Sequence, residues 1–132
     1  FRGLVFFNSL SDLGATEERL QFNGASAVSL ASDINVKFRK VILEKFKNHE
    51  ISLLLGTDLL ARGIDIENLE VVINFDIPRD REAYTHRAGR TGRMGNEGSV
   101  ISLVTHPEDL KKLKKFAKVS ELVLKNQELH EK

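Results

Sequence analysis

Five short runs of mostly apolar residues recur along the chain, and they constrain its fold more than any other feature. Each run has four to six residues, too few for a helix, and most are rich in residues that favour β-strands. Segments with helical character separate the runs. Strands that are apolar throughout are buried on both faces, so this alternation predicts an α/β domain with a mostly parallel sheet covered by helices on both faces. The predicted strands are residues 4–7, 26–30, 51–55, 71–75 and 99–104.

The intervening segments predict the helices. Residues 11–22 form the first, a segment beginning at Asp33 and ending near residue 48 forms the second, and residues 59–66 predict a turn with a short helix. Thr105 to Glu108 offers a capping box for a last helix, with Leu110, Leu113 and Ala117 on its buried side. Residues 119–132 are either a further helix or a tail. In the second helix we expect an apolar stripe to face the core, made of Phe38, Val41, Ile42 and Phe46.

Composition limits the classes of function. A chain of 132 residues is one domain that can bury a core, and 41% hydrophobic with 30% charged residues is typical of a soluble globular protein. No apolar run approaches the length of a bilayer span, so we expect no membrane association. The absence of cysteine excludes disulfides and thiolate zinc sites and fits an intracellular protein of either cytoplasm or nucleus. Because the chain opens with Phe1-Arg2-Gly3 and no Met, directly before a predicted strand, we expect a piece of a longer protein.

The residues from Tyr84 to Gly95 carry the clearest functional signal. Three arginines and a histidine fall between residues 86 and 93, and Gly89 and Gly92 each cost a helix about 1 kcal/mol relative to alanine. If the segment is helical, His86, Arg90 and Arg93 share one face. One interpretation is a solvent-exposed basic helix with no binding role. This density of arginine with glycine, however, suits binding of a polyanion such as a nucleoside triphosphate or a nucleic-acid backbone. The net charge of +1 means that such affinity must come from local clustering.

Two polar stretches follow successive predicted strands of the chain. Residues 57–65 come after the third strand, and the arginine-rich segment comes after the fourth. In parallel sheets, ligands bind beyond the carboxyl ends of the strands, so both stretches are expected in one site. His49, His106 and His130 show no metal-ligand spacing, and we predict no metal site in this chain.

These stretches resemble the motifs of the DEAD-box RNA helicases. Residues 56–65 (GTDLLARGID) resemble motif V of that family, and residues 84–93 (YTHRAGRTGR) resemble motif VI, with its HRxGRTGR signature. Residues 6–9 resemble motif IV, Arg39 occupies the position of the motif IVa arginine, and residues 71–78 resemble the strand between motifs V and VI. The order agrees from residue 4 to about 105, which implies the second RecA-like domain of such a helicase. Departures from the family pattern are Ala31-Ser32, Val36, Phe38 and Ala88.

The resemblance implies roles for individual residues. Asp65 would bond the ribose of ATP, Arg90 and Arg93 would reach the γ-phosphate, one of them as an arginine finger, and His86 would couple the nucleotide to the RNA side. Arg62 faces either the RNA or the opposite domain. RNA-backbone contacts with little sequence preference are implied for Asn8, Arg39, Thr57, Arg62 and Gly63.

Two further polar residues keep structural interpretations. Arg87 is either functional or part of a structural ion pair, and we expect Asp58 to cap the short helix after the third strand.

The chain contains neither a GxxxxGK[ST] phosphate loop nor a DEAD sequence. A first RecA-like domain of the same protein would therefore supply the phosphate loop and bind Mg²⁺, and the chain alone is predicted to be inactive. Protein cofactors are further possible partners. The alternative function is a non-catalytic RNA- or protein-binding module from a degenerate helicase, and a DNA helicase of the same superfamily is a third interpretation.

Overall fold

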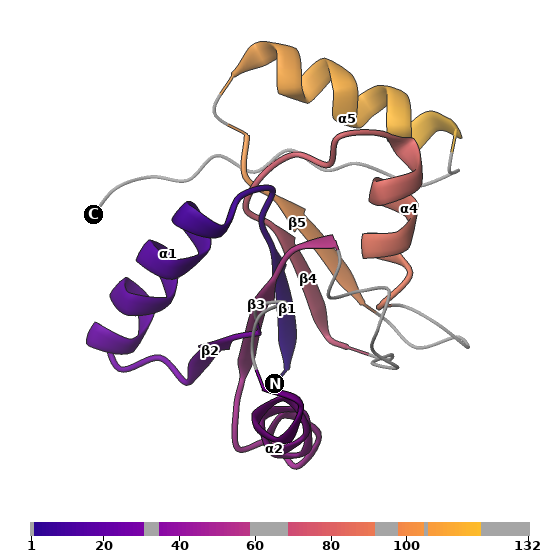
Figure 1. Cartoon of the computed structure of the whole chain (residues 1–132). Coiled ribbons are helices and arrows are strands. Elements are labelled where there is room, and N and C mark those ends of the chain that lie inside the picture. The colour runs from indigo at the N-terminus through magenta and orange to yellow at the C-terminus, as the bar shows by residue number, and fades with distance from the viewer. Residues whose placement is uncertain (1, 31–34, 59–68, 92–97, 105, 120–132) are drawn as a thin grey trace.

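A parallel sheet of five strands in the order β2-β3-β1-β4-β5 forms the centre of the fold in this computed structural model (Figure 1). The structure describes residues 2–30, 35–58, 69–91, 98–104 and 106–119. All four pairs of neighbouring strands are parallel, so the predicted parallel sheet is confirmed. Each strand begins and ends within two residues of its prediction: β1 Gly3–Phe6, β2 Ala27–Ser29, β3 Leu53–Gly56, β4 Val71–Asn74 and β5 Ser99–Ser102.

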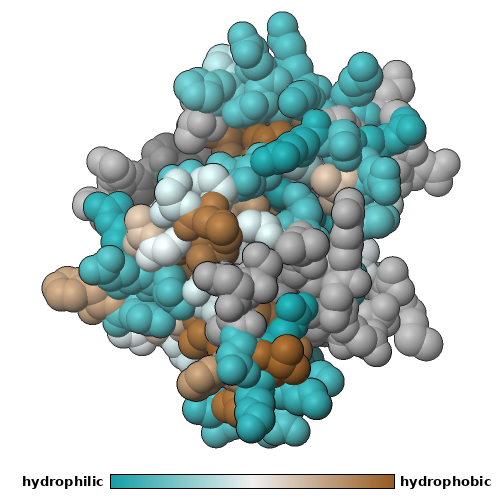
Figure 2. All heavy atoms as spheres, viewed as in Figure 1, coloured by the Kyte–Doolittle hydropathy of each residue, from teal (hydrophilic) through white to brown (hydrophobic). Residues whose placement is uncertain are grey.

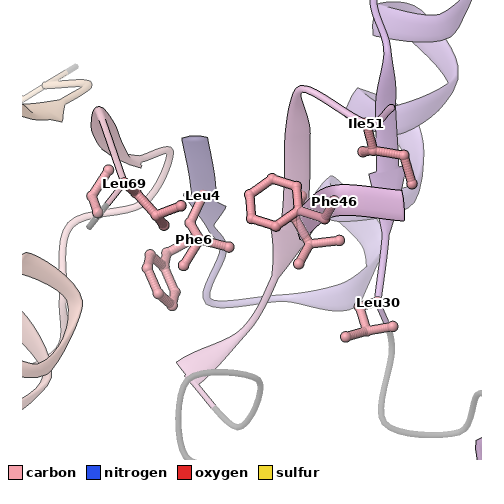
Figure 3. Close-up of a cluster of buried hydrophobic side chains, with 8 residues drawn as sticks. Leu4, Phe6, Leu30, Phe46, Ile51 and Leu69 are labelled. Carbon is pink, nitrogen blue, oxygen red and sulfur yellow. The ribbon is translucent and has the colours of Figure 1, made fainter. Parts of the chain in front are cut away.

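Alternate side chains of β1 divide the core into two layers. Leu4 and Phe6 point to the face that is covered by α2 (Val36–Lys47), where the Phe46 ring is fully buried (Figure 3). Val5 and Phe7 point to the opposite face, where they share an apolar cluster with Leu13 of α1 (Leu10–Phe22). Because β1 lies in the middle of the sheet, its side chains are buried on both faces. The sheet therefore has a helical layer on each side, as expected.

The predicted apolar stripe of α2 is only half correct. Phe46 is buried and Ile42 packs against the same cluster, whereas Phe38 is 65% exposed and Val41 is 49% exposed. At about 100° per residue, Val41 lies roughly 140° around the helix from Phe46, and Phe38 is about two turns away along the axis. Only the narrow face around Phe46 therefore reaches the sheet. The helix begins at Val36 because Asn35 caps it by accepting a hydrogen bond from the Lys37 amide at 2.8 Å.

The last helix, α5 (Pro107–Val119), packs against α4 (Arg81–Ala88) and not on a face of the sheet. Leu113 is buried with Tyr84 of α4 and with Ile77, which confirms the prediction for Leu113. Lysines 111, 112, 114 and 115 are exposed, and Figure 2 shows a hydrophilic surface over this helix. Thr105 of the predicted capping box lies outside the described residues, and so do residues 120–132.

Two side chains of α1 cover the outer edge of β2. The carboxylate of Glu17 accepts a hydrogen bond from the backbone N–H of Ser29, and the amide of Gln21 donates to the carbonyl of Ala27 at 2.8 Å. Both backbone groups belong to the edge of β2 that faces away from β3. Uncovered groups of this kind are a template for pairing with another strand. One face of α1, with Glu17 and Gln21 four residues apart, therefore closes this edge.

We predict that Glu17→Ala combined with Gln21→Ala opens the edge of β2. Each lost hydrogen bond is expected to reduce the free energy of unfolding by about 1 kcal/mol, and the bare edge should promote self-association. Chemical denaturation and light scattering over a concentration series measure the two effects. The matched control is Glu18→Ala, an exposed neighbour on the same helix. A monomer as stable as the control would show that the two side chains do not protect the edge.

Gly3 is required by the close approach of β4 to β1. A Cβ atom at Gly3 would lie 2.6 Å from Cγ1 of Val71 and 3.2 Å from Cδ2 of Leu53. Val71 is buried and branched at Cβ, so it has little freedom to move away. The centre of the sheet therefore has no room for a methyl group at this position.

We predict opposite effects for two glycine-to-alanine substitutions. Gly3→Ala should destabilise the chain by about 1–3 kcal/mol through overpacking. Gly14→Ala should stabilise it by about 0.5–1 kcal/mol, because Gly14 is exposed within α1 and a Cβ atom there meets nothing within 4 Å. Urea denaturation of the two variants checks both signs, and an unchanged midpoint for Gly3→Ala would contradict the packing argument.

Candidate functional site at the carboxyl ends of the strands

Helix α4 carries the first half of the arginine-rich segment. It follows β4 after the buried Pro78, and Asp80 caps it by accepting a hydrogen bond from the Ala83 amide at 2.8 Å. Tyr84 anchors the helix on α5, and burial raises the pKa of its phenol, so the group stays protonated near neutral pH. His86 is exposed on this helix, whereas Arg87 is fully buried.

The helical part of the arginine-rich segment ends before Arg90. α4 ends at Ala88, and the next residues form a turn in which the amides of Arg90 and Thr91 bond the carbonyls of Arg87 and Ala88. The Leu69 amide then donates to the Arg90 carbonyl at 3.1 Å. His86 therefore lies within α4 and Arg90 in the turn that follows it, and the expected shared face of His86, Arg90 and Arg93 stays a prediction. Arg93 lies outside the described residues.

Arg87 is the centre of the site. Its Nε and Nη2 atoms form a bidentate ion pair with the carboxylate of Asp58, at 2.7 and 2.8 Å. Nη2 also donates to Oδ1 of Asn8 at 2.8 Å, and Nη1 donates to Oδ1 of Asn74 at 3.2 Å and to the carbonyl of Asp76 at 2.9 Å. The guanidinium lies 5.1 Å from the centre of the Phe6 ring. We call Arg87 with Asn8, Asp58, Asn74 and Asp76 the Arg87 network.

The Arg87 network joins the carboxyl ends of neighbouring strands. Asn8 follows β1, Asp58 follows β3, and Asn74 is the last residue of β4. The Asn74 amide extends the network to β5 by donating to the hydroxyl of Ser102 at 3.0 Å. The Asn8 amide nitrogen donates to the Ile77 carbonyl at 3.0 Å, so both ends of this side chain are engaged. Four strands are therefore tied to α4 at the edge where ligands of parallel sheets bind.

Among the predicted site residues, Asn8 contacts Arg87. Thr57 and His86 are the sequence neighbours of Asp58 and Arg87, which form the ion pair. Arg90 is partly exposed one turn further on, and Arg39 is partly buried in the first turn of α2. Arg62, Gly63, Asp65 and Arg93 lie outside the described residues.

Sequence reasoning gave Asp58 a different role. Its carboxylate is the counter-ion of Arg87, so the ion pair that was one interpretation of Arg87 is present. The short helix that Asp58 was expected to cap lies outside the described residues. A partial signal was present, because polar residues at the carboxyl ends of strands in one parallel sheet lie at the same edge, and buried polar groups need a partner. That signal indicates the edge and not the pairing of Asp58 with Arg87.

Neither a metal cluster nor a membrane span is found among the residues that the structure describes. No group of three or more histidine, aspartate and glutamate side chains there could hold a metal ion. No helix in the same part of the chain is both long and apolar enough to cross a bilayer.

Comparison with known proteins agrees with the fold. The family described as "Helicase conserved C-terminal domain" matches residues 1–95. The chain therefore belongs to the helicase conserved C-terminal domain family. Its fold is that of the RecA-like C-terminal domain of DEAD-box proteins.

Three of these similar proteins are informative. The ATP-dependent RNA helicase DeaD of Buchnera aphidicola is 38% identical over 87 residues, which are 66% of this chain and 14% of the relative. The C-terminal domain of the DEAD-box protein Dbp5 has a TM-score of 0.82 at 29% identity, covering 90% of this chain and 69% of that one. Dbp5 of S. cerevisiae bound to RNA and ADP BeF3 has a TM-score of 0.80 at 29% identity, covering 89% of this chain and 32% of that one. The chain thus spans about one seventh of the length of the curated relative.

We predict that Asp58→Ala destabilises the chain by about 3 kcal/mol, because it leaves the buried Arg87 cation without a counter-ion. Arg87→Met combined with Asp58→Ala should cost less than the sum of the two single substitutions, since the pair is removed as a unit. Denaturant titrations of the four proteins give the coupling free energy. A strictly additive result would show that the ion pair contributes no specific interaction.

Proposed function

We propose that this domain supplies arginines to ATP and backbone contacts to RNA in an ATP-dependent RNA helicase. The observation that carries the proposal is the convergence of residues from β1, β3, β4 and α4 on one sheet edge around Arg87. A related domain of S. cerevisiae has been solved as part of Dbp5 bound to RNA and ADP BeF3. ATP would lie between this domain and a first RecA-like domain, and its hydrolysis would drive remodelling of short RNA duplexes.

Arginine suits the nucleotide side of the site. Negative charge spreads over the phosphoryl oxygens in the transition state, and a planar, permanently charged guanidinium meets it with two parallel hydrogen bonds. We propose that Arg90 and Arg93 contact the γ-phosphate, that Asp65 bonds the ribose, and that His86 couples the nucleotide to the RNA side. Of these residues, Arg90 and His86 lie within the described part of the chain. The first domain would hold Mg²⁺.

The RNA side would recognise the backbone and not the bases. Hydroxyl, amide and guanidinium groups that contact phosphate and sugar carry little sequence information. Contacts to the 2′-hydroxyl would favour RNA over DNA. The proposed residues are Asn8, Arg39, Thr57, Arg62 and Gly63.

We predict that the 132-residue chain alone does not hydrolyse ATP, whereas a protein that also carries the first RecA-like domain shows RNA-stimulated ATP turnover. In the two-domain protein, Arg90→Lys and Arg93→Lys keep the charge but lose the planar fork. The variant that removes the arginine finger should lower kcat by about 10³-fold or more. Steady-state ATPase assays with RNA measure the effect.

The matched control is Arg81→Lys, because Arg81 is an exposed arginine at the start of α4. Its kcat should remain that of the unmodified protein. RNA binding by the two-domain protein without any ATP turnover would favour the alternative of a non-catalytic binding module. Equal stimulation by DNA and RNA would contradict the preference for RNA.

A further inference from the structure

We infer that Arg87 is a positioning residue that fixes the RNA-contacting residues relative to the ATP-contacting residues while touching neither ligand. The inference rests on the function proposed above and adds a role for a side chain that the function did not use. Three observations carry it: the saturation of the guanidinium, the span of its partners, and the place of those partners next to the proposed contact residues.

The guanidinium of Arg87 has no donor left for a ligand. Arginine carries five N–H donors, and the five hydrogen bonds of Arg87 use all of them on acceptors within the domain. The side chain has 0% exposure, and one face of it is covered by the Phe6 ring. A phosphate oxygen could bind Arg87 only by displacing one of these partners. Its effect on either ligand must therefore be indirect.

The partners of Arg87 span most of the sheet. They come from the ends of β1, β3 and β4, and the Asn74 amide passes the connection on to Ser102 of β5. Arg87 itself belongs to α4. A single side chain thus sets the distance between α4 and several strand ends. Because these bonds are short and internal, the elements are held as one unit.

The partners of Arg87 adjoin the proposed contact residues. Its bond to Oδ1 of Asn8, with that of the Asn8 amide to the Ile77 carbonyl, fixes the orientation of this side chain. Its ion pair with Asp58 fixes the residue that follows Thr57. On the other side, His86 precedes Arg87, and the Arg90 amide bonds the Arg87 carbonyl at 3.3 Å. A shift of Arg87 therefore moves the proposed RNA and ATP contacts relative to one another.

The substitution Arg87→Lys tests the geometry of the Arg87 network separately from its charge. Arg87→Lys keeps a cation for Asp58, but an ammonium group has three donors in a tetrahedral arrangement and cannot reach five acceptors that surround a plane. The acceptors on Asn8 and Asn74 would lose their partner. Because Asp58 keeps a counter-ion, the variant should stay folded. Because Asn8 and Asn74 lose a partner, the site residues should be less well placed.

The test is the steady-state ATPase activity of the two-domain protein, titrated separately with RNA and with ATP. For Arg87→Lys we expect the half-saturating RNA concentration to rise about tenfold and kcat at saturating RNA to fall, with KM for ATP within about twofold of the unmodified value. Arg81→Lys, on the same helix, should leave all three values unchanged. Asp58→Asn keeps the shape of the carboxylate and should show the same split to a smaller extent.

Other outcomes would overturn the inference. A rise of KM for ATP with unchanged RNA dependence would make Arg87 a direct nucleotide contact. A fall in kcat that only tracks the folded fraction, with both half-saturation values unchanged, would make it merely structural. If Arg87→Lys does not fold, Asp58→Asn decides, and an unchanged RNA dependence in that variant refutes the inference. No RNA-stimulated turnover in the unmodified protein would refute the proposed function, and the inference with it.

Discussion

The rest of the site depends on the bonds between the buried guanidinium of Arg87 and its five acceptors. A cation out of contact with water is stable only when a counter-ion and further acceptors surround it. Asp58 supplies the negative charge, and two asparagines and a carbonyl supply the remaining acceptors. This requirement explains why a sheet that is otherwise apolar becomes polar at its carboxyl edge. The same requirement decides how α4 sits on the sheet, since the helix must bring Arg87 over the ends of the strands.

The centre of the sheet solves a different problem, which is close packing. β1 is buried on both faces and lies so near β4 that Gly3 leaves no space for a side chain. On one face Phe46 of α2 fills the space over β1, and on the other Leu13 of α1 does so. The apolar layers hold the strands in register, and that register brings Asn8 and Asp58 to the same level, two residues beyond Asn74. Packing thus prepares the positions that Arg87 then joins.

The sequence predicted what depends on local pattern. The strands could be placed because short apolar runs between helical segments have few other structures available. The stripe of α2 was misplaced at Phe38 and Val41, since periodicity shows which residues share a face but not how much of that face a sheet covers. The pair of Arg87 with Asp58 joins residues 29 positions apart, and nothing in the spacing of either residue indicates the other. The backbone bond that joins Arg90 to Leu69 after the end of α4 is again a long-range contact that local pattern does not indicate.

Because Arg87 is buried, its ion pair responds to salt differently from charges on the surface of the domain. Dissolved ions screen exposed charges beyond about 8–10 Å at physiological ionic strength, but they act far less on a pair in which one partner is fully enclosed. Attraction between this domain and a phosphate backbone would weaken steeply as salt is added. The internal scaffold would keep its dimensions over the same range. If the domain binds RNA as proposed, the slope of the affinity with salt concentration should therefore report the number of phosphate contacts. A change in the structure of the domain should not contribute to that slope.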